Sequence, residues 1–514
     1  MRNRITYITL LLIGLGFVSC KKSFIALTSK TELNTANYFK TSDEFQQALV
    51  GVYQALRGWA QPTSWLMGEA RTDNSRYVIN PANRGISNVY MENINDWVDD
   101  SFNSFTESKY TNDYIGIQRA NIILDQIANA NIDAATKNSV TGEAETLRAF
   151  FYFDLVQYYG AVPLNLHTVT SPADAFLTRA EPNAVYTAII NDLTDAIKKL
   201  PAKITFPQSG RATIGTAQTL LANVYMVQKK YAEAATLLKS VTQLGYQLNS
   251  KYANVFLTTN KNSAESIFEV QYQQGAANGQ YSTFIYNFIP PVINTTVITG
   301  VNTNTINGEA QNVPTQDIID SYETADARLD ASVGVIQGYY DGSSNFVPES
   351  LQSIIGYKTP ANKVAKLFAK KFLHPSTTAG QTDDNWPVYR YSDALLMLAE
   401  SLNEQGNSSE ALPYLNQVRQ RAGLTPSNQT DQTSLRAIIA HERRIELAFE
   451  GKRWTDLLRT GQVATVMTAF AKKVKQQDAS VPANAYNITA NRLLFPIPAT
   501  EIQINPKITQ NPGY

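Results

Sequence analysis

Two segments far apart in the chain carry the same spacing of small and apolar residues, within 213–245 and 390–423. The matching sets are Leu221, Ala222, Tyr225, Ala234, Leu238 and Val241, then Leu398, Ala399, Leu402, Ala411, Leu415 and Val418. In both sets the successive intervals are 1, 3, 9, 4 and 3 residues. Steps of three and four place residues on one helix face, so each segment predicts a pair of packed helices.

The spacing matches the tetratricopeptide pattern, in which a small residue lets the first helix approach the second. Leu193, Ala196 and Pro201 fit the end of a third copy. The repeats are not in tandem, so a large segment is inserted between them. The insert, 249–388, is dominated by Asn, Thr, Gly and Tyr with Val/Ile pairs, which favours short strands and long loops.

Helical periodicity also marks the segments 42–59, 110–130, 143–159, 183–200 and 434–459. Residues 143–159 are apolar nearly all round, which predicts a buried helix. Residues 60–105 lose the periodicity and are predicted as one long loop rich in Asn, Asp, Gly, Trp and Tyr. The expected organisation is a helical region over 36–248 that contains this loop, the insert 249–388, and a second helical region with its tail over 389–514.

The N-terminus has the composition of a processing signal. Arg2 and Arg4 precede an apolar run, Ile8 to Val18, that is too short to span a bilayer and ends at Ser19 and Cys20. This arrangement resembles a lipobox, which predicts a signal peptide over 1–19, lipidation of Cys20 and a polar tether over 20–35. The alternative is an ordinary secretory signal with a stray cysteine.

Composition and motifs exclude several classes of function. Lys+Arg and Asp+Glu number 44 each, which argues against a nucleic-acid partner. With one cysteine and three dispersed histidines, neither a metal site nor a cofactor is predicted. His441–Glu442 lacks a second histidine, because Ile445 stands in its place, and no catalytic residue is assigned. The acid pairs Glu69/Asp73 and Asp99/Asp100 keep a glycosidase as an alternative.

Aromatic residues interleaved with amides and guanidinium groups mark two candidate binding segments. Sugars present CH faces that stack on rings and hydroxyls that need polar partners. The candidate ligand-binding residues are Trp65, Asn74, Arg76, Tyr77 and Trp97 in the N-terminal loop, and Tyr272, Tyr281 and Tyr286 in the insert. Replacing Trp97 or Tyr77 with alanine is expected to weaken glycan binding without lowering the melting temperature much. The alternative is that these aromatics pack the loop onto the helices.

Four long segments make the chain resemble the SusD/RagB family of nutrient-binding outer-membrane lipoproteins of Bacteroidetes. They are EAETLRAFFYFDLVQYYGAVPL (143–164), the segment 390–423, ERRIELAFEGKRWTDLLRTG (442–461), and the tail from LFPIPATEI to NPGY. The resemblance implies a mainly α fold, with tetratricopeptide-like helix pairs supporting a loop-rich face with a few short strands. It also implies a lipid-anchored protein on the outer face of the outer membrane. Such a protein captures an oligosaccharide or a peptide and passes it to a SusC-like TonB-dependent transporter, without catalysis.

Two other functions remain open at this point. One is a lipid-anchored tetratricopeptide scaffold that binds only protein, and the other is a lipid-anchored glycoside hydrolase. The insert and the aromatic loop favour glycan capture over the scaffold. The charged residues of 442–450 can pair along a helix and are predicted to stabilise the fold.

Overall fold

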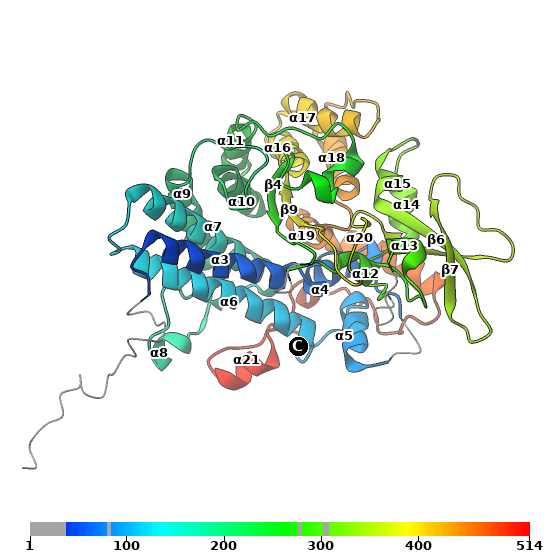
Figure 1. Ribbon diagram of the computed structural model, residues 1–514, viewed down its shortest axis with the longest axis horizontal. Helices are drawn as coiled ribbons and strands as arrows, with labels where there is room; N and C mark the ends of the chain where they lie inside the picture. Colours follow the sequence, from blue (N-terminus) through cyan, green and yellow to red (C-terminus); the bar gives the residue numbers. More distant parts are fainter. Residues whose placement is uncertain (1–37, 80–83, 276–279, 302–307) are drawn as a thin grey trace, which may run out of the picture.

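The computed structural model describes residues 38–79, 84–275, 280–301 and 308–514 (Figure 1). The predicted signal peptide (1–19) and the predicted tether (20–35), which includes Cys20, lie outside the described residues. In the ranges above, no helix combines the length and the apolar character that crossing a bilayer requires.

A stack of helices forms the body of the protein. Its members are α3 (Ser42–Trp59), α6 (Ser104–Ile127), α7 (Ala134–Tyr159), α9 (Pro182–Lys199), α10 (Ile214–Val227), α11 (Tyr231–Val241), α16 (Tyr391–Glu404), α17 (Ser408–Arg421) and α18 (Gln432–Glu446). Neighbours in this order pack on one another, except that α18 packs mainly on α16. Because α11 packs on α16, the two repeats separated in sequence are adjacent in space. The predicted mainly helical fold with tetratricopeptide-like pairs is confirmed.

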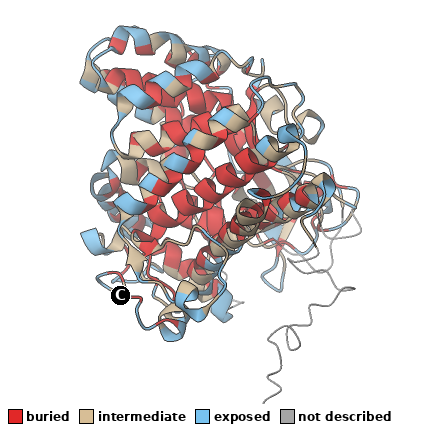
Figure 2. Cartoon of the chain, turned by 90° about the vertical axis from the view of Figure 1, so that its left-hand side faces the viewer, coloured by how far each residue is buried: buried red, intermediate tan, exposed pale blue. Residues whose placement is uncertain are grey.

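Helix α7 is the centre of the stack. From residue 140 to residue 159 every position except Gln157 is buried, and Figure 2 shows the buried residues running through the central helices. Its Arg148 donates two hydrogen bonds, of 2.8 and 2.7 Å, to Asp192 of α9. Helix α6 approaches closely at Gly116, where a Cβ would lie 2.2 Å from the Phe151 ring. The expectation of a buried helix at 143–159 is therefore confirmed.

The segment between α11 and α16 leaves and rejoins the stack through one two-stranded ladder. Strand β4 (Ser266–Val270) pairs antiparallel with β9 (Trp386–Arg390). Between them a three-stranded sheet in the order β7–β6–β8 carries a small core of its own against α12 (Phe284–Phe288) and α13 (Thr296–Thr299). The sheet strands are β6 (Val333–Tyr340), β7 (Phe346–Ser353) and β8 (Val364–Ala369).

The short remaining elements complete the fold. The strands are β1 (Ser75–Arg76), which pairs with β5 (Val313–Pro314), and β2 (Val162–Pro163), which pairs with β3 (Arg179–Ala180). The short helices are α8 (Pro172–Ala175), α14 (Gln316–Ser321), α15 (Arg328–Ser332), α21 (Ala499–Ile504) and the 3₁₀ turns Tyr252–Val255, Thr258–Asn260 and Ala490–Arg492.

The prediction of one long loop over 60–105 is wrong. This region contains α4 (Pro62–Trp65), a π-helical turn, η2 (Leu66–Ala70), and α5 (Ile86–Asn95). All residues from 63 to 75 are buried. A helix shows apolar periodicity only when one face meets water, so α4 and η2, which are buried on nearly all sides, have none.

The helix predicted over 434–459 is divided in two. After α18, the chain turns at Phe449 (φ 68°) and Gly451 (φ 75°) before α19 (Arg453–Thr460) begins. Glu69 of η2 holds this turn, because its carboxylate accepts hydrogen bonds from the backbone N–H of Phe449 (2.6 Å) and of Arg453 (3.4 Å). A Cβ on Gly68 would lie 2.4 Å from the Gly451 carbonyl oxygen, so η2 and the turn need this glycine.

Buried charges fasten the insert to the scaffold. Arg390, at the end of β9, lies 3.1 Å from Glu265, 2.8 Å from Glu446 and 2.9 Å from Glu450. Arg328 of α15 reaches Glu442 and Glu446 of α18. Burial alone would raise the pKa of Glu446, but the guanidinium groups of Arg421 and Arg390 hold that pKa far below its usual range. The sequence predicted that the charged residues of 442–450 pair along their own helix. The ion pairs of Glu442, Glu446 and Glu450 instead reach partners outside this segment, among them Arg328 and Lys371 of the insert.

Candidate functional site

Trp65 and Tyr272, two of the predicted ligand contacts, lie in a buried aromatic cluster. Their exposed fractions are 0% and 4%. Trp65 contacts Phe284 and Phe288 of α12 at centroid distances of 5.8 and 5.0 Å, and Tyr272 contacts Phe284 at 5.3 Å. A ring without an accessible face cannot stack on a sugar. The prediction of ligand contact is corrected for both residues, which join α4 to the insert.

Three further predicted contacts are also core residues. Trp97 is fully buried, and its Nε1 donates to the Arg71 carbonyl oxygen (2.9 Å). Tyr77 and Tyr286 expose 2% and 1% of their surface. Burial raises the pKa of Tyr77 above its usual range, with nearby Glu92 adding to the effect. Asn74 is buried as well; its Nδ2 donates to Glu69 Oε1 (2.8 Å). Burial corrects the prediction of direct contact for Trp97, Tyr286 and Asn74, whereas Tyr77, although nearly buried, borders the groove described below.

The acid pairs considered for a hydrolase are engaged in internal contacts. Glu69 caps the turn before α19, and Asp73 accepts two hydrogen bonds from Arg453, at 2.8 and 2.9 Å. Asp99 lies 2.5 Å from Arg71, with both side chains fully buried. Asp100 is exposed and accepts from the backbone N–H of Phe102. Neither pair presents two free carboxyl groups to a cleft.

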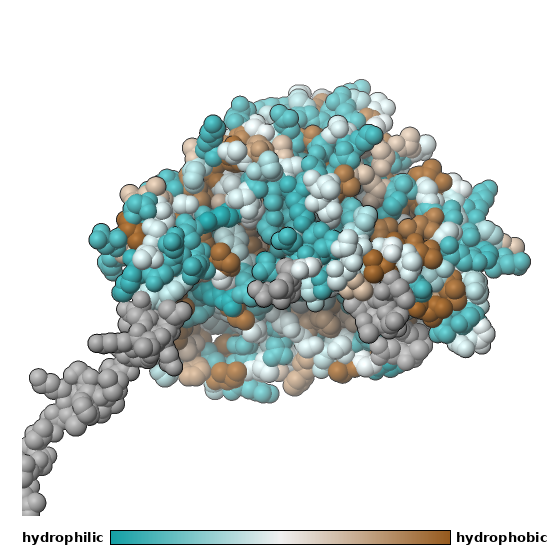
Figure 3. Space-filling model, viewed as in Figure 1, coloured by the Kyte–Doolittle hydropathy of each residue, from teal (hydrophilic) through white to brown (hydrophobic). Residues whose placement is uncertain are grey.

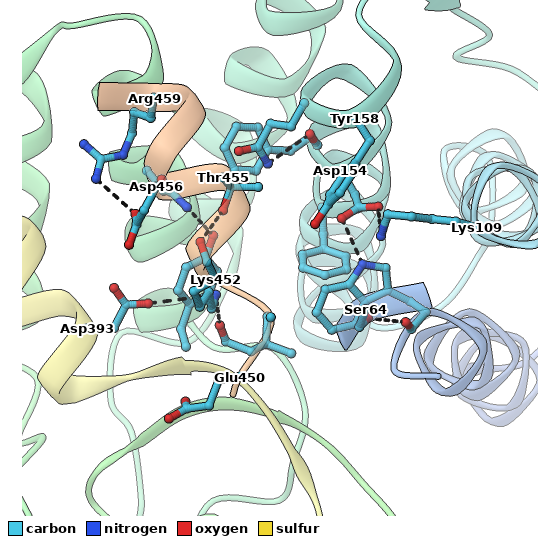
Figure 4. Close-up of a pocket in the computed structure, with 18 of the residues that line it drawn as sticks. Ser64, Lys109, Asp154, Tyr158, Asp393, Glu450, Lys452, Thr455, Asp456 and Arg459 are labelled. Atoms are coloured by element: carbon cyan, nitrogen blue, oxygen red, sulfur yellow. Dashed lines mark hydrogen bonds and ion pairs between the residues drawn. The ribbon is translucent and has the colours of Figure 1, made fainter. Parts of the chain in front are cut away.

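A small cavity between α6, α7 and α19 is lined by paired charges (Figure 4). Lys109 lies 2.5 Å from Asp154, and Arg459 lies 3.1 Å from Asp456. The cavity volume is about 50 Å³. That space suits a water or two, since each takes up about 30 Å³ in the liquid. Ligand pockets begin at roughly 300 Å³, so this cavity is too small for a sugar.

A larger groove of about 580 Å³ runs beside β1 and α20 (Val463–Gln477), and we call it the Arg76 groove. One wall is β1 with the residues after it, together with β5 and the start of α14; the other is α20 and the residues after that helix. Its lining residues are Arg76, Tyr77, Val78, Ile79, Val313, Pro314, Thr315, Gln316, Asp317, Asp320, Phe470, Lys473, Val474, Gln477, Asp478 and Ser480. Two of the predicted contacts, Arg76 and Tyr77, therefore border one groove.

The charges of the Arg76 groove are paired across its walls. Arg76 lies 3.0 Å from Asp478, and Lys473 contacts Asp317. Although burial opposes it, hydrogen bonds from Lys473 and Arg444 hold the pKa of Asp317 below its usual range. Gln477 is exposed, and Val78 is 44% exposed. The groove thus offers donors, acceptors and an apolar surface together.

Two other cavities have similar volumes but contain no predicted contact. One, of about 670 Å³, borders Asp125 and His167, and the other, of about 620 Å³, lies among α16, α18, α19 and α20. Tyr281 is half-buried and does not line the Arg76 groove. In the part of the chain that the structure describes, no group of three or more His, Cys, Asp or Glu side chains could hold a metal ion.

Hydrophobic side chains gather on the right of the face shown in Figure 3, where α13 and the β6–β7 pair lie in Figure 1. Val297 of α13 is 40% exposed and Tyr340 of β6 is 50% exposed. These residues surround the small second core rather than the helical stack.

Two protein-family models match the chain. The model described as "SusD family" matches residues 264–514, and the one described as "Starch-binding associating with outer membrane" matches residues 24–226. Only 1–23 and 227–263 remain unmatched. The chain belongs to the SusD/RagB family. The resemblance carried by the four segments is thereby confirmed, and the second model describes its members as starch-binding and associated with the outer membrane.

Full-length relatives support the same assignment. The SusD-like protein P2 of Formosa agariphila is 28% identical over 100% of both chains, and the SusD-like protein P38 of that organism is 26% identical over 98% of both. Among solved structures, a laminarin binding SusD-like protein is 27% identical with a TM-score of 0.73, covering 92% of this chain and all of that one. Of these three proteins, the solved structure is named as a laminarin binder, and the two relatives are named only as SusD-like.

The α20 wall contributes groove-lining residues that were not among the ligand contacts predicted from the sequence. Lys473 and Gln477 lie in a helix whose polar face looks like any solvated surface. The only available signal was their spacing of four, which puts both on one helix face. Nothing in that spacing indicates that the face lies opposite β1.

Proposed function

We propose that this protein captures an oligosaccharide at the cell surface, in the Arg76 groove, and passes it to a SusC-like TonB-dependent transporter in the outer membrane. The proposal is carried by the family match over nearly the whole chain. It is supported by the 27% identity to a laminarin binding SusD-like protein and by a groove of ligand-binding size. Lipidation at Cys20 would hold the protein on the membrane, facing outward.

The side chains of the groove favour a neutral glycan. Arg76 and Lys473 are already paired with Asp478 and Asp317, and Asp320 adds a further carboxylate. An anionic polysaccharide would meet no unpaired cation among these lining residues. Sugar hydroxyls both donate and accept, so they suit the mixture of amide, carboxylate and ammonium groups.

The test is isothermal titration of the purified protein with soluble glycans. The panel contains laminarin, a starch oligosaccharide, a fructan, and two anionic polysaccharides. We expect saturable binding to a neutral member and none to the anionic ones. Absence of binding to every glycan would overturn the capture proposal and favour the protein-binding scaffold. Release of reducing sugar from any member would favour the hydrolase.

A further inference from the structure

Arg444, near the end of α18, binds both chain segments that build one wall of the Arg76 groove. Its Nε donates to Asn74 Oδ1 (2.8 Å) and its Nη1 to Ser321 Oγ (3.0 Å). Its Nη2 lies 2.9 Å from Asp73 Oδ2 and 2.8 Å from Asp317 Oδ2. Asp73 and Asn74 lead into β1, whereas Asp317 and Ser321 belong to α14, which follows β5. One guanidinium group therefore holds the two segments together.

A short ladder and a few hydrogen bonds also join the two segments. The β1–β5 ladder consists of two residue pairs, Ser75 with Pro314 and Arg76 with Val313, and a proline donates no ladder hydrogen bond. The Thr315 backbone N–H donates to the Asn74 carbonyl oxygen (3.0 Å), and its hydroxyl donates to that of Asp73 (2.7 Å). The Val78 N–H donates to the Ala310 carbonyl oxygen (3.0 Å). Isolated two-stranded pairs are marginally stable in water. The alignment of Arg76 with Asp317 thus depends on contacts from outside the ladder.

We propose that Arg444 is a positioning residue for ligand binding, which assigns a role to the 442–461 motif beyond stabilising the scaffold. Arg444 does not line the groove; it sets the spacing of β1 and β5 and the direction of the Asp317 carboxylate. This inference rests on the proposed function of the groove. Arginine is required because its planar group offers five donors in a fixed geometry, whereas lysine is a single point charge.

After Arg444 is removed, the carboxylates of Asp73 and Asp317 each still have a cationic partner. Asp73 keeps its two hydrogen bonds from Arg453, and Asp317 keeps Lys473. The variants Arg444→Lys and Arg444→Gln are therefore expected to fold. Arg436→Gln is the matched control, because Arg436 is on the same helix and pairs with Glu404, away from the groove.

Hydrogen exchange on the purified protein tests the positioning role without any ligand. In both Arg444 variants we expect the amides of Val78 and Thr315 to exchange about tenfold faster or more, while α7 and α16 keep the wild-type rate. Arg436→Gln should leave all of these unchanged. Unaltered exchange at 73–78 and 313–317, or equal acceleration in α7 and α16, would overturn the proposal.

Titration with laminarin, or with the neutral glycan that the wild type binds, gives the second readout. We expect at least about tenfold weaker binding for Arg444→Lys and unchanged binding for Arg436→Gln. Wild-type affinity in Arg444→Lys would overturn the positioning role even if exchange is faster. If the wild type binds no glycan, the proposed function fails, and local exchange alone then decides whether Arg444 positions this wall.

Discussion

The buried Arg71 guanidinium contacts three aromatic rings from distant parts of the chain, and Trp97 carries one of them. The Arg71 guanidinium lies 4.5 Å from the Trp97 ring, 5.2 Å from the Trp454 ring and 4.4 Å from the Phe495 ring. Arg71 is fully buried and paired with Asp99. Stacking on aromatic faces stabilises a desolvated guanidinium, so the rings and the ion pair depend on each other.

Replacement of Trp97 by alanine is expected to destabilise the protein by about 3–5 kcal/mol, because it removes a buried indole and exposes Arg71. Chemical denaturation measures the loss. The control is Phe102→Ala, since Phe102 is 65% exposed and close in sequence. An unfolding free energy close to that of wild type in Trp97→Ala would contradict the buried role.

Glu145 gives the fold a dependence on pH. Burial raises the pKa of Glu145 to about 8, although Lys199 donates a hydrogen bond to it (3.0 Å). An acid whose pKa is higher in the folded state binds its proton more tightly there. Its contribution to stability is therefore complete below the unfolded pKa of about 4.3 and is lost as the pH rises through the folded value.

The variant Glu145→Gln cannot ionise and should escape this loss. We expect its melting temperature, relative to wild type, to increase between about pH 5 and about pH 9. Scanning calorimetry at both values checks the sign. The same difference at both pH values would show that Glu145 does not titrate in this range.

Single residues also show where sequence reasoning is limited. The spacing of aromatic and polar residues in 60–105 predicted a sugar-binding surface, and Arg76 and Tyr77 do border the groove. Trp65 instead meets Phe288 edge to face, and the Trp97 ring lies against the Arg71 guanidinium. A ring prefers the same partners in a ligand and in a protein core, so composition alone cannot separate the two cases.

At the scale of secondary-structure elements, α20 forms one wall of the groove, and its exposed side chains can be substituted. Lys473 and Gln477 line the groove, whereas Lys472 and Gln476 are exposed on the same helix and do not. This arrangement offers pairs of the same residue types that differ in the direction they face and in the contact of Lys473 with Asp317.

The double variant Lys473→Ala/Gln477→Ala should weaken glycan binding by about 1–3 kcal/mol, because it removes two polar partners of the ligand. Lys472→Ala/Gln476→Ala should bind like wild type. Titration measures both, and both should melt near the wild-type temperature. Equal affinities of the two double variants would exclude α20 from the site.

The junction of β9 with α18 depends on Arg390. Arg390→Met takes one of two or more buried cations from Glu265, Glu446 and Glu450, and removing one partner of a buried pair costs about 3–5 kcal/mol. The glutamates keep Arg421, Arg328 and Lys371. Arg436→Met, which breaks a pair whose arginine is 44% exposed, should cost at most about 1 kcal/mol. Urea denaturation compares them; similar losses would contradict the difference in burial.

Periodicity predicted most of the long helices because they have one wet face or form part of a repeat. Helix α7, buried nearly all round, was predicted from its long apolar run instead. It failed at η2 and at the α18–α19 turn. The turn depends on Glu69, which precedes Phe449 by hundreds of residues, so no local pattern contains it. The packing of α11 on α16 was hidden for a similar reason, because neither repeat indicates where the insert leaves the stack.

For the whole molecule, attachment to the membrane is the property that a single substitution can test. Cys20→Ala removes the proposed lipidation site. Each CH₂ of a membrane-buried acyl chain contributes roughly 0.8 kcal/mol of membrane affinity, and the variant loses this contribution. We expect the variant in the soluble periplasmic fraction. Fractionation with the outer membrane in the absence of a SusC-like transporter would contradict the anchor.

The β4–β9 ladder brings both ends of the intervening segment to adjacent positions, with Val270 opposite Trp386. A loop whose ends are already joined changes length at little entropic cost. The segment between them can therefore change length without separating the two strands, as long as Arg328, Lys371 and Phe284 keep their contacts with the helical scaffold. Exchange of this segment between family members, with those contacts retained, would therefore alter one face of the molecule and leave the opposite side of the stack as it is.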